Sequence, residues 1–389
     1  MKLGVLTSMG SLSGYSELGR ETTLGLHKLG VDIELKVQDE KLLKSSQSSL
    51  SKEVLELIKE CKVKEFSPGI PILSIGTPPQ YEIDPTRFAI GVGLWEAYSL
   101  PPIWLQLMNS MNLIITFSEF NKQVFVRQGL DKSKIEIIPP AVNSERFNTE
   151  IEPFYVSNIK PFTIMYLSQM ILRKGYDRLI LAAMRTFRKN DDVSILLKLP
   201  PPSNQLQIDS MMKKLEAIKK EAGPSKVQLY VNYSAIPVEK VPKCYQIVRK
   251  RVPDKIYPYL STDEMPRGIF CLPSLGEGIS IALLEAMSSG VLTLSTNVTG
   301  NSFMNTSNSI IIESGPPIRN LDLELEHALY KGSPFPNVTI ESISQSLNKA
   351  YSMSTQERDT ITKSARLDAE NYTYEKMSQA ILNAIEKHM

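Results

Sequence analysis

Two glutamates separated by seven residues form the part of the sequence with the clearest chemical meaning. Glu277 lies in the segment Gly276-Glu277-Gly278, and Glu285 lies in the apolar stretch that follows it. If a helix begins near Ser280, Glu285 falls on its second turn and Glu277 precedes its N-terminus. Carboxylates accept hydrogen bonds from sugar hydroxyls, whereas N–H groups and the dipole at a helix start favour phosphate oxygens. This combination is typical of a site for a nucleotide-sugar.

Two adjacent cations, Arg173 and Lys174, precede Gly175 at an expected loop-to-helix junction. Breaking the bond between a sugar and a diphosphate leaves negative charge on the departing phosphate, which a cation must stabilise. The sequence contains no Asp-x-Asp segment of the kind that holds a metal in many transferases. We therefore expect Arg173 and Lys174 to supply this charge, and no metal or other cofactor to be needed.

The chain has 389 residues, which exceeds the usual size of one hydrophobic core, so we expect two domains. Short apolar strands alternate with helices in both halves, and this alternation predicts parallel sheets covered on both faces. The predicted fold is α/β, with two Rossmann-like doubly wound domains. We expect an N-terminal domain at residues 1–155 and a C-terminal domain at residues 156–373. The helix at about 374–389 is expected to pack back on the first domain.

The expected strands before the chemically interesting loops are Leu3 to Leu6, Thr163 to Leu167 and Gly268 to Leu272. The first is followed by a Gly/Ser loop and a helix from about Ser16 to Leu29. Ligands of doubly wound sheets bind at the carboxyl ends of strands, which is where these loops lie. Residues 232–267 combine prolines with many charges and give no clear prediction of helices or strands.

Composition excludes several classes of protein. Lys+Arg number 44 against Asp+Glu 42, a formal charge of +2, which gives no electrostatic reason to expect a nucleic-acid partner. The cysteines Cys61, Cys244 and Cys271 lack the spacing of a disulfide framework or zinc site. No apolar run reaches about 18 residues, so any membrane contact is expected to be peripheral at most. We expect a cytoplasmic protein.

Four stretches together resemble the GT-B fold glycosyltransferases of the family-4 type (glycosyltransferase group 1), which retain the anomeric configuration. They are the Glu277 to Glu285 segment; Leu167-Ser168-Gln169-Met170-Ile171-Leu172-Arg173-Lys174-Gly175; Ser118-Glu119-Phe120-Asn121 with Ile137-Ile138-Pro139-Pro140; and Leu94-Trp95-Glu96 with Leu100-Pro101 and Trp104. Their order and spacing are more specific than any single motif.

The resemblance implies a hexosyltransferase whose two domains face each other across a cleft, with the nucleoside-diphosphate-sugar held by the C-terminal domain. Glu285 would then bind the ribose hydroxyls, and Glu277 would lie near the donor sugar. The amides of Gly278, Ile279 and Ser280 would face the phosphates or the sugar. Sugar would pass to an acceptor hydroxyl with retention. The acceptor, whether glycan, lipid, protein or small molecule, stays open.

The sequence departs from the family pattern at several positions. Gln169 stands where an arginine is usual, and a neutral amide loses the charge-assisted contact with phosphate. Thr299 and Gly300 occupy the place of a glycine pair. In the N-terminal half, Gly14 is expected to approach the donor phosphates. Ser13 and Glu96 are the acceptor-side candidates.

Other functions also fit parts of the pattern. A catalytically degenerate nucleotide-sugar-binding protein is favoured by Gln169. A phosphorylase or an epimerase would use the same fold and the same donor. A nicotinamide-dependent oxidoreductase fits least, because Gly10 and Gly14 have G-x-x-x-G spacing and not the G-x-G-x-x-G fingerprint.

Overall fold

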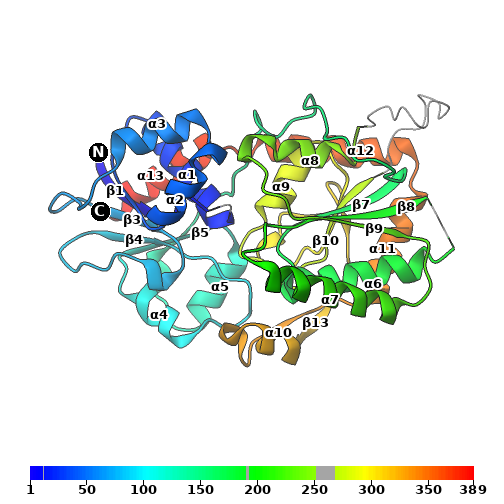
Figure 1. The fold of residues 1–389 in the computed structure, drawn as a ribbon. Coiled ribbons are helices and arrows are strands. Elements are labelled where there is room, and N and C mark those ends of the chain that lie inside the picture. The colour runs from blue at the N-terminus through cyan, green and yellow to red at the C-terminus, as the bar shows by residue number, and fades with distance from the viewer. Residues whose placement is uncertain (12, 190–191, 251–267) are drawn as a thin grey trace. The chain divides into compact units, whose positions relative to one another are not determined.

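A computed structural model describes residues 1–11, 13–189, 192–250 and 268–389 of the chain (Figure 1). The chain divides into two compact units. Unit 1 comprises Met1–Val142, Pro237–Glu239 and Tyr372–Met389, and unit 2 comprises Asn143–Ile236 and Lys240–Asn371. The C-terminal helix α13 (Tyr374–His388) therefore belongs to unit 1, where it packs against α1 (Gly14–Lys28).

Unit 1 is built on one parallel sheet with the strand order β2-β1-β3-β4-β5-β6. Its strands are short and almost wholly buried, as expected for a parallel sheet covered by helices on both faces. They are β1 (Lys2–Thr7), β2 (Asp32–Val37), β3 (Ile72–Ile75), β4 (Ala89–Val92), β5 (Leu113–Thr116) and β6 (Ile135–Ile137). The other helices of this unit are α2 (Glu40–Ser46), α3 (Lys52–Cys61), α4 (Pro102–Asn109) and α5 (Glu119–Arg127).

Unit 2 contains a second parallel sheet with the order β12-β11-β10-β7-β8-β9. Its strands are β7 (Phe162–Leu167), β8 (Val193–Lys198), β9 (Gln228–Asn232), β10 (Ile269–Leu272), β11 (Thr293–Ser295) and β12 (Ile310–Ile311). The helices are α6 (Tyr176–Thr186), α7 (Gln205–Ala222), α8 (Pro242–Gln246), α9 (Ile281–Ser288), α10 (Leu321–Glu326), α11 (Ile340–Ser352) and α12 (Thr355–Glu370). The predicted α/β class with two doubly wound sheets is confirmed.

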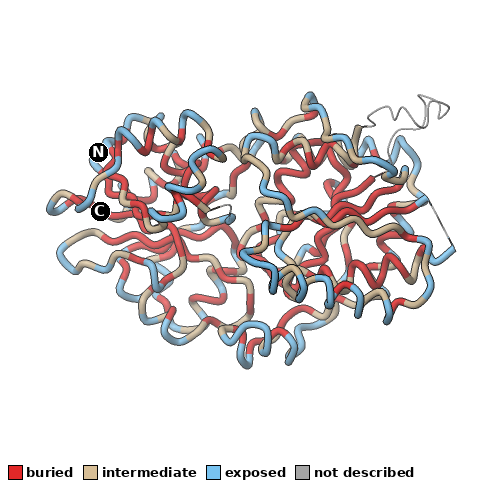
Figure 2. The backbone as a smooth tube through the Cα atoms, in the orientation of Figure 1, coloured by how far each residue is buried: buried red, intermediate tan, exposed pale blue. Residues whose placement is uncertain are grey.

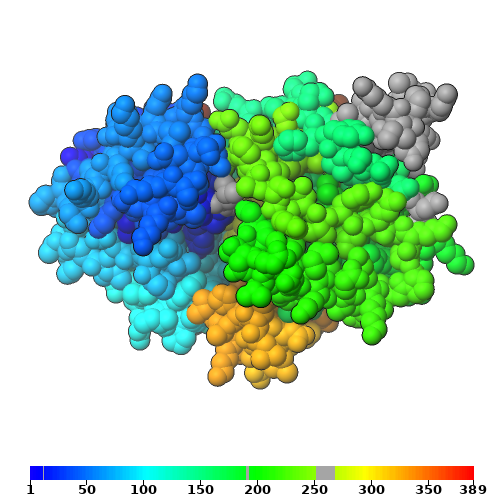
Figure 3. Space-filling view, viewed as in Figure 1, coloured from blue at the N-terminus to red at the C-terminus, as the bar shows by residue number. Residues whose placement is uncertain are grey.

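Burial follows the layers of each unit, with buried strands inside and exposed outer helix faces (Figure 2). Helix α9 is an exception, because Leu283, Leu284, Ala286 and Met287 leave it without a solvated face. In contrast, α7 buries Leu215 and Ala222 and exposes most of its surface, which is drawn in green in Figure 3. The apolar run that carries Glu285 is thus a buried helix.

The strand order reverses beside the first strand of each sheet, and this place is called the switch point of the sheet. In unit 1, β1 lies between β2 and β3, and in unit 2, β7 lies between β8 and β10. Loops leave the carboxyl ends of such neighbouring strands toward opposite faces, and the crevice that this creates is the usual place for a ligand. The loops after β7 and β10 are the ones in which the sequence places its charged candidates.

Some elements differ from those expected. The antiparallel two-stranded sheet of β13 (Gly315–Arg319) and β14 (Pro334–Asn337) lies where no strand was predicted. Between these two strands lie helix α10 (Leu321–Glu326) and a 3₁₀ turn, Ala328–Tyr330. Helix α1 begins at Gly14 and not near Ser16, because the Ser13 hydroxyl caps it by accepting the Ser16 N–H. Of the 232–267 segment, residues 251–267 lie outside the described residues.

Candidate functional site

Two loops of unit 2 bring three charged side chains together. Arg173 and Lys174 follow β7, and Glu277 follows β10, its neighbour in the sheet. The Nζ atom of Lys174 donates to both carboxylate oxygens of Glu277 at 2.7 Å. Arg173 Nη1 lies 3.2 Å from Oε2 of Glu277 and also donates to the Gly276 carbonyl. The residues that the sequence proposes as catalytic therefore form one cluster at the switch point of the second sheet.

Burial strengthens the electrostatic interactions among the three charged side chains. Glu277 is 3% exposed and Arg173 is 9% exposed, whereas Lys174 is half-buried. Burial raises the pKa of the Glu277 carboxyl, but the charges of Lys174 and Arg173 outweigh that effect and hold the pKa below its ordinary value. Glu277 is therefore ionised at neutral pH. One carboxylate against two cations leaves the three side chains with a net positive charge, which suits a diphosphate.

The backbone explains why the two loops meet so closely. Gly175 has a φ of +70°, and a side chain there would collide with the carbonyl of Pro273. The Leu275 N–H donates to the carbonyl of Arg173 at 2.8 Å. The Ser274 hydroxyl donates to the same carbonyl at 3.2 Å. Glycine at position 175 is thus required by the contact between the loops.

A third loop, after β11, is hydrogen-bonded to the backbone of the loop that carries Glu277. The hydroxyl of Thr299 accepts the Glu277 N–H at 2.8 Å, and the Gly300 N–H donates to the Glu277 carbonyl at 2.8 Å. A side chain at Gly300 would collide with the carbonyl of Gly278. The sequence marks these two residues only as departures from a glycine pair. It gives no sign that they hold Glu277.

Glu285 lies on α9, one helix turn into the element that begins after the Glu277 loop. It is 9% exposed. Its Oε2 accepts a hydrogen bond of 2.7 Å from the Tyr245 hydroxyl, which comes from α8. Burial, and then the charge of Glu285, raise the pKa of Tyr245 well above its ordinary value, so the phenol keeps its proton and donates. Tyr245 is a site residue that the sequence does not reveal, because α8 lies in a segment without a clear pattern.

The remaining donor-side candidates have different surroundings. Gly278 and Ser280 are buried, Ile279 is half-buried, and Ser280 is the N-cap of α9. All three lie between the charged cluster and the helix of Glu285. Gln169 is exposed, and its carbonyl accepts the Tyr166 hydroxyl at 2.6 Å. Its side chain therefore stands outside the buried cluster.

The N-terminal candidates belong to unit 1. Ser13 and Gly14 are exposed at the start of α1, after β1, and the space beside Gly14 is open. Glu96 is half-buried after β4, and β3 separates its strand from β1. The preceding residue, Trp95, is buried and packs edge-on against Trp104 at 4.9 Å between ring centroids. The motif around Trp95 thus contributes to the core.

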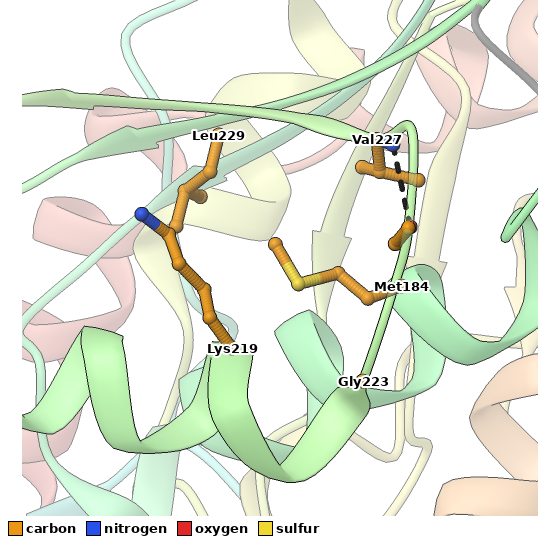
Figure 4. A pocket seen from close by; sticks show the side chains of 6 residues that line it. Met184, Lys219, Gly223, Val227 and Leu229 are labelled. Atoms are coloured by element: carbon orange, nitrogen blue, oxygen red, sulfur yellow. Dashed lines mark hydrogen bonds between the residues drawn. The ribbon is translucent and has the colours of Figure 1, made fainter.

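A pocket between α6, α7 and β9 lies at the other edge of the second sheet (Figure 4). Val227 and Leu229 stand at the amino end of β9, and Met184 stands at the end of α6. Because ligands of doubly wound sheets bind at the carboxyl edge, this pocket is a poor candidate for the donor. Among residues 1–11, 13–189, 192–250 and 268–389, no group of three or more His, Cys, Asp or Glu side chains is arranged to hold a metal.

Solved glycosyltransferases are similar to this chain over its whole length. HepE from Anabaena, solved in complex with UDP and glucose, is 14% identical with a TM-score of 0.64, and 100% of each chain is covered. A glycosyltransferase from Rickettsia africae is 16% identical with a TM-score of 0.65, covering 100% of this chain and 98% of that one. WaaG, a glycosyltransferase involved in lipopolysaccharide biosynthesis, is 13% identical with a TM-score of 0.59, covering 99% of each. The shared fold is the GT-B architecture.

Comparison with curated proteins finds no match. In the parts of the chain that the structure describes, no helix has the length and apolarity needed to cross a membrane. The model of the family Glycosyl transferases group 1 matches residues 147–367, which include Arg173, Lys174, Glu277 and Glu285. Because this match covers more than half of the 389 residues, the chain belongs to the group 1 glycosyl transferases.

Proposed function

We propose that this protein transfers a hexose from a nucleoside-diphosphate-sugar to an acceptor hydroxyl, with retention of the anomeric configuration and without a bound metal. The observation that carries the proposal is the net positive cluster of Arg173, Lys174 and ionised Glu277 at the β7/β10 switch point. Membership of the group 1 family supports it. So does HepE, which has been solved with UDP-glucose.

The cluster supplies what the bond cleavage needs. The bond between the anomeric carbon and the phosphate oxygen breaks, a new bond forms to the acceptor oxygen, and the acceptor proton passes to the departing phosphate. At an effective dielectric constant of about 20, one cation at about 4 Å stabilises that phosphate by roughly 4 kcal/mol. An effect of this size corresponds to about a thousandfold in rate if it is expressed mainly in the transition state.

The side chains divide this work according to burial. Lys174 is half-buried, so its ammonium is the cation that we assign to the departing phosphate. Arg173 is more buried and donates to the Gly276 carbonyl, so it contributes charge while holding the Glu277 loop. Ionised Glu277 can accept hydrogen bonds from sugar hydroxyls. Glu285 is assigned to the ribose hydroxyls, and the amides of Gly278, Ile279 and Ser280 to the phosphates.

A donor screen tests the proposal. UDP-, GDP- and ADP-sugars are compared first by the rise in Tm that each causes, and then by release of the nucleotide. We expect one class of donor to raise the Tm and to be turned over. Binding without any turnover would instead support a degenerate binding protein. If no donor binds or reacts, the proposed function is wrong.

A further inference from the structure

Thr299 has a backbone conformation that its residue type disfavours. Its φ is +56°, in the left-handed region where a β-branched side chain is strained and a glycine is not. It stands directly beside the proposed catalytic loop and is 5% exposed. A glycine would remove this strain, but it would also lack the hydroxyl that the threonine side chain supplies.

The Thr299 hydroxyl provides a hydrogen bond with a fixed direction. It donates its proton to the Val298 carbonyl at 2.7 Å and accepts the Glu277 N–H at 2.8 Å. The next residue, Gly300, donates its N–H to the Glu277 carbonyl at 2.8 Å. The loop after β11 therefore holds both backbone polar groups of Glu277. Because Glu277 and Thr299 are both buried, bulk water cannot replace the hydroxyl.

The close approach of the two loops fixes the geometry. A side chain at Gly300 would collide with the carbonyl of Gly278, so the loops are in direct backbone contact. The Glu277 carboxylate then reaches Lys174 at 2.7 Å and Arg173 at 3.2 Å. A shift of the Glu277 backbone would move the carboxylate relative to both cations.

We propose that Thr299 is a positioning residue, whose hydroxyl holds Glu277 at the place where its carboxylate meets Lys174 and Arg173. We call the two hydrogen bonds from Thr299 and Gly300 to the Glu277 backbone the clamp. The role of Thr299 in catalysis rests on the proposed glycosyl transfer, whereas the existence of the clamp does not. The positioning predicts that loss of the hydroxyl slows the chemical step and leaves donor binding largely intact, because the residues assigned to the nucleotide stay in place.

The test compares Thr299→Val, which removes the hydroxyl at nearly constant shape, with Thr299→Ser, which keeps it. Thr293→Val is the matched control, because Thr293 is a buried threonine of β11 whose hydroxyl donates to the Asn308 carbonyl at 3.4 Å and does not contact Glu277. Amide hydrogen exchange of the peptide that contains Glu277 reports on the clamp. Donor turnover, measured as nucleotide release, gives kcat and KM.

We expect Thr299→Val to speed exchange at Glu277 and to lower kcat by about tenfold to a hundredfold, with KM changed by less than about twofold. Thr299→Ser should restore both properties, and Thr293→Val should alter neither. Unchanged exchange in Thr299→Val would overturn the clamp, and faster exchange with an unchanged kcat would overturn the positioning role. If the wild type turns over no donor, the proposed function fails, while the exchange result still decides whether the clamp exists.

Discussion

The loops at the switch points of the two doubly wound sheets make different kinds of contact. In unit 1, the loop after β1 turns three backbone N–H groups, those of Met9, Gly10 and Ser11, onto the carboxylate of Asp39 at 2.8 to 3.0 Å. In unit 2, the loops after β7 and β10 place Arg173 and Lys174 against Glu277. In the loop after β1, the backbone N–H groups are thus already hydrogen-bonded to a carboxylate of the protein. The loops after β7 and β10 bring together three charged side chains whose net charge is positive.

The two sheets have the same strand order around the switch point, but only the loops of unit 2 present charged side chains there. Backbone N–H groups of such a loop can bind a phosphate, but Asp39 already occupies those of residues 9–11. The Arg20 guanidinium adds to this closed arrangement by donating to the carbonyls of Met9 and Ser11 at 2.8 Å. We therefore assign the diphosphate to the cluster of unit 2. The loop after β1 is instead bonded to Asp39 and to Arg20 of α1.

The largest effect is expected from Lys174→Ala, which removes the more accessible cation. Turnover of the donor should fall at least about a hundredfold, because the charge on the departing phosphate loses its main partner. Nucleotide release at saturating donor measures this effect. Lys213→Ala, on the exposed face of α7, is the control and should keep normal turnover. Similar rates in both variants would remove Lys174 from the mechanism.

Asp39→Ala tests the other side of the comparison. It leaves the N–H groups of residues 9–11 without their acceptor, so the free energy of unfolding should fall by about 2–4 kcal/mol. Chemical denaturation measures this change. The affinity for the preferred nucleotide should stay the same, because the proposed diphosphate site lies in unit 2. A selective loss of nucleotide affinity with normal stability would reverse the assignment of the two loops.

The pH dependence of stability tests the charge state of Glu277. Its folded-state pKa is lowered from 4.5, so its ionisation stabilises the fold above pH 4.5, and this contribution is lost as the pH falls through the folded-state pKa. Unfolding free energies of the wild type and Glu277→Gln are compared across this range. The stability of the wild type relative to Glu277→Gln should be constant at pH values well above 4.5 and should fall as the pH is lowered further. A difference that already changes near neutral pH would mean that the pKa is raised.

A smaller effect is expected from Tyr245→Phe, which removes the hydrogen bond to Glu285 and keeps the ring. The loss of about 1 kcal/mol corresponds to a several-fold weaker affinity for the nucleotide, measured by titration calorimetry. Turnover at saturating donor should change little, because the cluster around Glu277 is untouched. If kcat falls and affinity does not, Glu285 acts in the chemistry and not in nucleotide binding.

Much of this arrangement follows from the sequence, for physical reasons. The buried strand before Glu277 is an apolar run between Gly268 and Pro273, and the strand before Arg173 begins directly after Pro161, so these ends can be read from the sequence. Parallel neighbours must then bring their following loops to one edge. The sequence does not predict the two-stranded sheet of β13 and β14, because Gly-Pro-Pro and Pro-Phe-Pro are typical of loops. Both of its strands are edge strands, and edge strands tolerate proline.

The parts of the site that the sequence misses depend on contacts between distant segments. Tyr245 reaches Glu285 from a helix of five residues, which is too short to show a periodic pattern. Thr299 gives no sign of its positive φ, and the contact between Gly300 and Gly278 joins segments that are far apart in the sequence. Asp39 likewise precedes a short helix and resembles an ordinary N-cap, yet its carboxylate binds the loop after β1.

The most direct test of the central claim is a crystal structure of the protein with the nucleotide of its preferred donor. We predict that the diphosphate lies at the carboxyl ends of β7 and β10, with a phosphate oxygen within hydrogen-bonding distance of Lys174 Nζ and the ribose hydroxyls at Glu285. A diphosphate bound instead to the backbone of residues 9–11, or away from Lys174, would contradict it.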